Sequence, residues 1–323
     1  MSHAVADPAH GHSHAPVLKM GVPIPNGKLG MWLFLGTEIM FFTAFIGTYI
    51  VLRLGSRGWP SDPEVTHIRI WAGGLNTFVL ITSSVFVVLA HEAVHNGKFK
   101  LATNWMIATT VLAFVFLGIK SYEYYGKFEH DILPGHVAES PRQALDKLAR
   151  ELDAASGLPP LQEKETHINN LIAANQGKDS KSLEAQRDAV QADIKKLDGV
   201  VAAYRPLKDK AKYGATTAVE AATLVHDIVP ELTSLKKEFP QFEAVHDPHP
   251  IKWGNTFASI YFLMTGFHAL HVIIGVIMFA IVIILGVGNK LGAQHSVMVE
   301  NFGLYWHFVD LVWIFLFPLI YIV

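Results

Sequence analysis

The feature that most constrains this chain is its apolar C-terminal segment, YWHFVDLVWIFLFPLIYIV, which carries His307 and Asp310 within otherwise hydrocarbon-like sequence. A charged side chain at the centre of a bilayer costs about 2.5–3.5 kcal/mol on insertion scales, so such residues are usually paired and functional. The pattern recurs upstream, with Glu38 in one apolar run and His268 and His271 in another. The sequence therefore predicts a membrane protein whose spans contain polar groups.

Composition and charge narrow the function classes. Hydrophobic residues make up 51% of the chain and charged residues only 17%, against roughly a quarter charged in a soluble domain. The formal net charge of -2 argues against nucleic-acid binding, which needs a basic face. The chain has no cysteine, which excludes disulfides, iron–sulfur clusters, thiolate-bound zinc and a thiolate-bridged copper centre within it.

Residues 1–29 form a His-rich N-terminal tail. Its histidines could bind a transition metal, as some His-rich tracts do. These histidines are His3, His10, His12 and His14. The tail lacks the basic n-region and continuous apolar core of a signal peptide, so we expect no cleavage. A disordered tail without metal is the favoured interpretation.

Five segments have the roughly 20 mostly apolar residues that a transmembrane helix needs. They are residues 30–53, 73–95, 101–123, 254–287 and 300–323. The second and third are joined by only a few residues, so we expect a tight antiparallel hairpin. The sequence thus predicts an all-α polytopic membrane protein with five transmembrane helices and a helical extramembrane insert. The predicted regions are the tail, spans 1–3 (30–127), the insert (128–252) and spans 4–5 (253–323).

The insert is hydrophilic and shows helical periodicity. Ser140 and Pro141 read as the N-cap and first residue of a helix, with one apolar face formed by Leu145, Leu148 and Leu152 and an end at Gly157 and Pro159-Pro160. A second stripe comprises Leu183, Val190, Ile194, Leu197 and Val201 and stops near Pro206, and a third helix covers about 215–239 with Pro230 inside it. Narrow stripes of this kind are typical of a helical hairpin or small bundle in water.

The basic residues of the short loops predict the orientation. Lys19, Lys28, Lys98, Lys100 and Lys290 fall on one side of a five-span protein, and Arg57 and Arg69 fall on the other. This weak bias places the N-terminus inside and the insert and C-terminus outside.

Residues 91–95, HEAVH, match the H-E-x-x-H pattern of zinc peptidases, in which two His bind zinc and the Glu acts as base. The pattern is short, it stands at the end of a predicted span, and no third-ligand motif follows. Polar residues at a membrane–water boundary are the favoured interpretation.

The intramembrane groups leave two interpretations open. His268, His271, His307 and Asp310 could ligate haem or copper, or they could bond one span to another, which is worth about 0.6–2 kcal/mol per bond in lipid. Spacing favours structural pairing, with a partner from another span for each His. For Glu38, a structural hydrogen bond and a proton-handling role are equally compatible with its apolar surroundings.

Taken together, the spans resemble subunit III of the haem–copper oxidases, the cytochrome c oxidase family. The matching motifs are LFLGTEIMFFTAF (33–45), LNTFVLITSSVFVVLAHEAVHNG (75–97), YEYY (122–125), TGFHALHVIIG (265–275) and Glu300 followed by YWHFVDLVWIFLF (305–317). They cover all five spans in order. HEAVH falls where family members have His-His at a helix end, so Glu92 replaces the second His and the zinc interpretation loses its support.

The resemblance implies a non-catalytic subunit without haem or copper of its own, in a multi-pass bacterial inner-membrane complex. Such a subunit packs beside the catalytic subunit I, which holds haem and copper, encloses structural phospholipids and supports proton uptake. Glu38 would be the buried carboxylate linked to that uptake. The fold-defining polar set would be His268, His271, Glu300, Trp306, His307 and Asp310, with Asn76, His91 and Glu123 in the helix-end and turn motifs.

Three features depart from the family pattern. The common form has seven spans and this chain lacks the first two, which puts the occupancy of the lipid cleft in doubt. A basic residue late in the penultimate span is replaced by Leu285, with Lys290 nearest. The insert has no family counterpart. We expect residues 135–240 to form an antiparallel helical domain on the outer face, where it contacts a cytochrome c domain, a supercomplex partner or an accessory subunit, or only covers this subunit.

Several alternatives remain open at the level of the sequence. Within the family, they are an accessory subunit of a quinol oxidase or of a nitric oxide reductase. Outside it, the alternatives are a haem-binding membrane redox protein and a proton-coupled transporter built around Glu38, although the sequence shows no inverted repeat.

Overall fold

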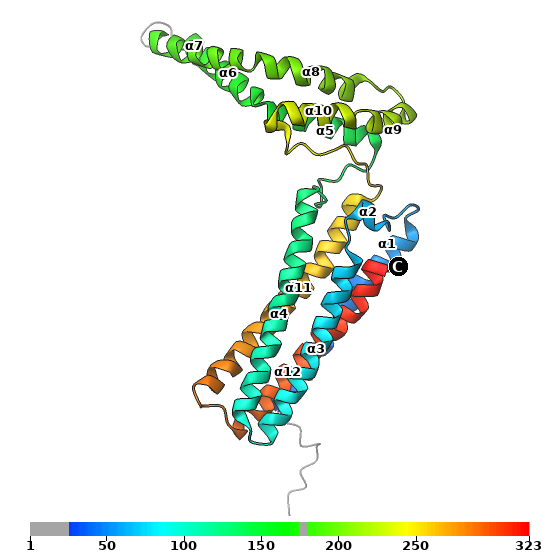
Figure 1. Cartoon of the computed structure of the whole chain (residues 1–323), viewed down its shortest axis with the longest axis vertical. Helices are drawn as coiled ribbons and strands as arrows, with labels where there is room; N and C mark the ends of the chain where they lie inside the picture. Colours follow the sequence, from blue (N-terminus) through cyan, green and yellow to red (C-terminus); the bar gives the residue numbers. More distant parts are fainter. Residues whose placement is uncertain (1–25, 175–179, 323) are drawn as a thin grey trace, which may run out of the picture.

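The computed structural model describes residues 26–174 and 180–322, which form a long helical bundle with a separate helical insert at one end (Figure 1). The N-terminal His3, His10, His12 and His14 lie outside the described residues. Among the described residues, five helices are long and apolar enough to cross a membrane, which confirms the predicted all-α polytopic architecture.

These membrane helices run close to the predicted spans. They are α1 (Asn26–Gly55), α3 (Ile70–His95), α4 (Phe99–Glu129), α11 (Gly254–Val287) and α12 (Ser296–Phe317), which continues into a π-helical turn, η3 (Pro318–Ile322). The predicted hairpin between α3 and α4 turns at Gly97, whose φ of +70 is accessible to glycine at little cost. The short helix α2 (Pro63–Thr66) lies in the loop that leads into α3.

The packing of the bundle is centred on α12. This helix contacts α1, α3 and α11, while α4 packs against both α3 and α11. Two buried tryptophans of α12 bond to α3, Trp306 donating to the Ser83 hydroxyl at 2.9 Å and Trp313 donating to the Thr77 hydroxyl at 3.1 Å. Helix α1 is peripheral, because only Phe42 and Tyr49 of its residues are buried.

The insert contains six α-helices among the described residues. They are α5 (Pro141–Ser156), α6 (Leu158–Ala174), α7 (Ser180–Lys196), α8 (Asp198–Tyr213), α9 (Ala218–Asp227) and α10 (Val229–Glu238), followed by the 3₁₀ turn η1 (Pro240–Phe242). Helices α5, α8, α9 and α10 form a compact bundle, and α6 and α7 form a hairpin that projects from it (Figure 1). The predicted stripe of Leu145, Leu148 and Leu152 lies fully buried in that compact core.

Local sequence explains the helix ends of the insert. Ser140 caps α5 by accepting from the backbone N–H of Gln143, and Gly157 ends that helix with a φ of +71. Thr217 and Glu220 form a reciprocal capping box at the start of α9.

Two of the predictions made from prolines in the insert need correction. Helix α5 ends at Ser156, as Gly157 and Pro159-Pro160 predicted, and these two prolines lie in the first turn of α6, where a proline loses no helical hydrogen bond. Pro230 likewise begins α10, so the third predicted helix is two helices. Pro206 lies inside α8 and does not end it; both Pro206 and Ala202, whose carbonyl loses its helical partner, are exposed to solvent.

The second predicted stripe is also divided. Val190 is buried within the α6–α7 hairpin, where Ile168 of α6 is buried too, whereas Val201 packs at the edge of the compact core. Ile194 and Leu197 remain half-buried between these two places.

Candidate functional site

Glu38 of α1 pairs with His271 of α11. The His271 Nε2 atom lies 3.0 Å from Glu38 Oε2, and Nδ1 lies 2.7 Å from the carbonyl oxygen of Phe267. A carbonyl only accepts, so Nδ1 carries a hydrogen and donates it. The Nε2–Oε2 contact then holds one proton, placed either on the carboxyl or on the ring. Glu38 is therefore joined to another span and shares a proton with it.

Aromatic residues enclose this pair. The Phe42 ring, one turn from Glu38, packs edge-on at 5.2 Å from the His271 ring. The Tyr305 hydroxyl of α12 donates to the His271 carbonyl at 3.0 Å. The Glu38 side chain keeps 19% of its surface exposed. The Glu38 carboxyl thus contacts the helical bundle on one side and is partly exposed on the other.

His307 and Asp310 lie one turn apart on α12 and face α3. His307 Nδ1 lies 2.5 Å from the Ser84 hydroxyl, so this His bonds to another span. Asp310 is 4% exposed, and neither of its carboxyl oxygens has a hydrogen-bond partner among the described residues.

His268 does not have the interspan hydrogen bond that we predicted. It is 1% exposed, and neither ring nitrogen has a partner within the part of the chain that the structure describes. The ring instead lies 5.1 Å from Trp313 and 5.6 Å from Phe116. Both neighbours present aromatic rings where a hydrogen-bond acceptor would be needed. Asn76 is equally buried, and its amide also lacks a partner in the described residues.

The other predicted site residues occupy the core and the helix ends. Trp306 is completely buried. Glu300 forms an ion pair with Lys28 at 2.5 Å, which joins the start of α12 to the start of α1. His91 is half-buried near the end of α3, and Glu92 is exposed.

A network that sequence reasoning missed surrounds Glu123. The Lys120 ammonium of α4 donates to Glu123 Oε2 at 3.0 Å, to the Tyr321 hydroxyl at 2.7 Å and to the Tyr261 hydroxyl at 3.3 Å. Both tyrosines donate to Glu123 Oε1, at 2.6 Å from Tyr261 and 2.8 Å from Tyr321. Since all four side chains are buried, the network links α4 to α11 and to the end of the chain.

A second buried lysine lies beside this network. Lys127 donates to the Thr66 carbonyl at 2.9 Å and lies 4.4 Å from the centre of the Tyr261 ring. The available signal was the segment KSYEYYGK, which places Lys120, Glu123 and Lys127 on one helical face. Average hydropathy, which identifies the spans, does not distinguish these two lysines from residues at a helix end, so the pattern pointed only to Glu123.

Outside the membrane helices, the loop before α3 places an imidazole against the end of α4. The His67 ring packs against the His130 ring, with the ring centres 3.7 Å apart and the planes tilted by 31°. Partial burial, reinforced by the charges of His130 and Lys127, lowers the pKa of His67 from 6.5 to about 4. His67 is therefore neutral at physiological pH, which permits the close contact.

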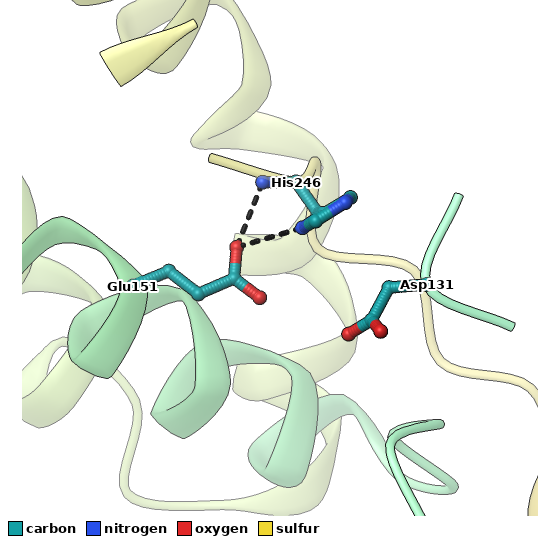
Figure 2. Close-up of side chains that lie close together, drawn as sticks. All are labelled: Asp131, Glu151 and His246. Atoms are coloured by element: carbon teal, nitrogen blue, oxygen red, sulfur yellow. Dashed lines mark hydrogen bonds and ion pairs between the residues drawn. The ribbon is translucent and has the colours of Figure 1, made fainter. Parts of the chain in front are cut away.

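A further group of ionisable side chains lies where the insert meets α4. Asp131, Glu151 and His246 come from the turn after α4, from α5 and from the segment before α11, and they converge in Figure 2. Lys147 pairs with Asp131 and lies 3.9 Å from Glu151.

The fold and these contacts define a class: a multi-pass helical membrane protein whose spans are joined by buried polar side chains. The family model described as cytochrome c oxidase subunit III matches residues 9–129 and 231–323, which is more than half of the chain. The chain belongs to the cytochrome c oxidase subunit III family.

Individual relatives agree with this assignment. Cytochrome c oxidase subunit 3 of Alkalihalophilus pseudofirmus is 37% identical over 100 residues, 31% of this chain and 48% of that protein. Quinol oxidase subunit 3 of Bacillus subtilis is 30% identical over 115 residues, 36% of this chain and 55% of that protein. For cytochrome c oxidase subunit 3 of Arabidopsis thaliana, identity is 25% over 321 residues, 96% of this chain and 71% of that protein.

The family match covers the membrane helices but not most of the insert. The matched segments span about half the length of the two bacterial relatives. The family match omits residues 130–230, which include helices α5–α9 of the insert. All predicted site residues fall within the matched ranges.

Proposed function

We propose that this chain is a non-catalytic subunit of a proton-pumping respiratory terminal oxidase. The observation that carries the proposal is the family match over all five membrane helices, in the same order. The chain would stabilise the catalytic subunit I within the membrane. Haem, copper and the reduction of oxygen belong, on this proposal, to the partner subunits.

Glu38 is the residue that we propose to link this subunit to proton uptake. Its pair with His271 holds one proton between a carboxyl and an imidazole, and a proton held between two such groups can be exchanged with water at small cost when the site opens. We propose that the pair supplies protons near the entrance of the partner's uptake path.

Membrane lipid is the second proposed partner. Large apolar side chains on α1 are exposed, among them Leu33, Met40 and Leu54. Such a surface needs hydrocarbon or another apolar subunit against it. Structural phospholipid between α1 and its neighbours fits this requirement.

On this proposal, other subunits of the complex bind the electron donor. Relatives of this chain include cytochrome c oxidase and quinol oxidase subunits, so both donors fit, and a nitric oxide reductase is a further family alternative. We favour a cytochrome c oxidase in the bacterial inner membrane, with the N-terminus inside and the insert and C-terminus on the outer face.

For the insert, we propose a contact with a partner that meets the oxidase at its outer face: a cytochrome c domain, a supercomplex partner or an accessory subunit. The position of helices α5–α10 at one end of the bundle in Figure 1 supports an extramembrane role for this region. Basic and acidic residues are nearly equal in number there, which favours contact by shape over long-range attraction. The competing role is a cover for this subunit alone.

The Glu38 role is tested by proton uptake of the intact oxidase in vesicles during turnover. Glu38→Ala should slow uptake while leaving haem content unchanged, whereas Glu92→Ala, at an exposed helix end, should have no effect. Equal uptake rates in the wild type and Glu38→Ala would disprove the role.

The role of the insert is tested by a deletion. Residues 135–240 are replaced by a short turn, and assembly, co-purifying partners and electron-transfer rate are compared with the intact complex. Loss of a partner or of rate is expected; if all three are unchanged, the insert only covers this subunit.

A further inference from the structure

A cavity of about 960 Å³ lies where the insert meets the end of α4. Its lining comes mainly from the end of α4 and the loop after it, from α5 and from the segment before α11, with His67 added from the loop before α3. Several carboxylates and four histidines line the cavity. The histidines are His67, His130, His246 and His249. The assigned family function uses none of these groups.

Three potential ligand atoms converge in this cavity. One atom each of Asp131, Glu151 and His246 lies within 4.8 Å of the others. In Figure 2, the carboxylates of Glu151 and Asp131 flank the His246 ring. Because the three residues come from three segments of the chain, an ion bound by all three would fasten these segments together.

The orientation of the His246 ring favours a ligand role. Its Nε2 lies 3.1 Å from the carbonyl oxygen of Glu129, so the neutral ring donates from Nε2 and keeps a lone pair on Nδ1. That Nδ1 lies 3.1 Å from Glu151 Oε2. Metal-binding histidines commonly donate their second N–H to a carbonyl in this way, which fixes the ring.

Among the described residues, the Asp131 carboxylate pairs with Lys147, and His136 Nδ1 lies 3.2 Å from Asp131 Oδ1. Lys147 contributes one positive charge to two carboxylates, and it is held elsewhere by the carbonyl of His136 at 3.0 Å. A divalent cation would neutralise both carboxylates and accept the lone pair.

We propose that Asp131, Glu151 and His246 bind a divalent transition metal ion of the zinc class, with the ion taking the place of the Lys147 ammonium. One imidazole and two carboxylates form a donor set that zinc accepts, whereas calcium and magnesium prefer oxygen ligands alone. The bound ion would clamp the insert to α4.

The test measures Zn²⁺ binding to the intact purified oxidase by equilibrium dialysis and elemental analysis. All proteins carry alanine at His3, His10, His12 and His14, so that the tail contributes no sites. One Zn²⁺ should be bound per chain beyond that bound by His246→Ala. Glu151→Gln should bind Zn²⁺ at least about tenfold more weakly, because a neutral amide oxygen replaces an anionic ligand and loss of an outer-shell partner alone costs about 10–100-fold.

Two further variants distinguish the proposal from an ion-pair cluster. His226→Ala, an exposed position of α9, should bind Zn²⁺ as the parent does. Lys147→Met should bind Zn²⁺ more tightly, because it removes the competing cation without removing a ligand. Equal binding by the parent and His246→Ala, binding to Lys147→Met that is not tightened, or equal affinity for Ca²⁺ would each overturn the proposal.

Discussion

The membrane bundle and the insert are both helical, but they are held together differently. Of the thirteen buried polar or charged side chains in the described part of the chain, only Ser156 belongs to the insert. The core of the insert is apolar, whereas the bundle buries Lys120, Glu123 and four intramembrane polar residues of α11 and α12.

The solvent explains this difference. In water, burial of apolar surface drives helices together. In lipid that force is absent between helices, so close packing and interhelical hydrogen bonds decide which helices associate. The comparison predicts that the bundle is most sensitive to loss of charge partners and to added volume, and that the insert is most sensitive to cavities.

The largest effect is expected at the Lys120–Glu123 network. Glu123→Gln leaves two buried ammonium groups, Lys120 and Lys127, without their carboxylate. Loss of one partner of a buried pair costs about 3–5 kcal/mol. Thermal inactivation of the purified complex should therefore shift to clearly lower temperature.

The matched control removes the second partner as well. Lys120→Met together with Glu123→Leu replaces the pair by apolar groups and should recover most of the loss. If the double variant is less stable than Glu123→Gln, the intact charged pair stabilises the bundle more than apolar side chains in the same positions do.

A cavity in the core of the insert should come next. Leu148 is 1% exposed, and truncation of such a residue costs about 2–5 kcal/mol. Leu148→Ala should accelerate proteolysis within residues 141–238 while the membrane spans stay protected. Leu171→Ala, at 37% exposure on α6, should behave as the wild type. Simultaneous loss of both regions would contradict their independence.

Added volume should affect the bundle at Gly275. A Cβ there would lie 2.6 Å from the Trp306 ring, and overpacking costs about 1–3 kcal/mol. Gly118→Ala is the control, because a Cβ at this α4 position meets nothing within 4 Å. The melting temperature should fall for Gly275→Ala and stay level or rise for Gly118→Ala. The reverse order would contradict the packing of α11 on α12.

The smallest effect is expected at Glu38. Glu38→Ala removes one interhelical bond, worth about 0.6–2 kcal/mol in lipid. Glu38→Gln should be milder, because its amide can donate to the Nε2 atom of His271. Thermal stability of the complex reports both variants. Equal losses for Ala and Gln would show that the bond itself does not hold α1.

Sequence reasoning reached the parts of this molecule that depend on local pattern. Hydropathy identified five spans, and the stripe of Leu145, Leu148 and Leu152 identified the core face of α5. Glu38 stood out because an ionisable residue in an apolar run is rare. In each case the relevant information lies within a few helical turns.

The remainder depends on distant partners. Nothing near Glu38 indicates that His271, 233 positions away, would bond to it. His268 was predicted to find a polar partner and instead packs between aromatic rings. The helix that continues through Pro206 also depends on context, because the missing hydrogen bond is tolerated where the backbone faces water.

The central claim, that this chain is an accessory subunit whose partner carries the redox chemistry, is tested most directly by purification through an affinity tag on the chain, followed by optical spectra. The account predicts that a catalytic subunit co-purifies with haem and that the chain separated from it shows no Soret band. A Soret band from the separated chain, or the absence of any haem-bearing partner, would contradict the account.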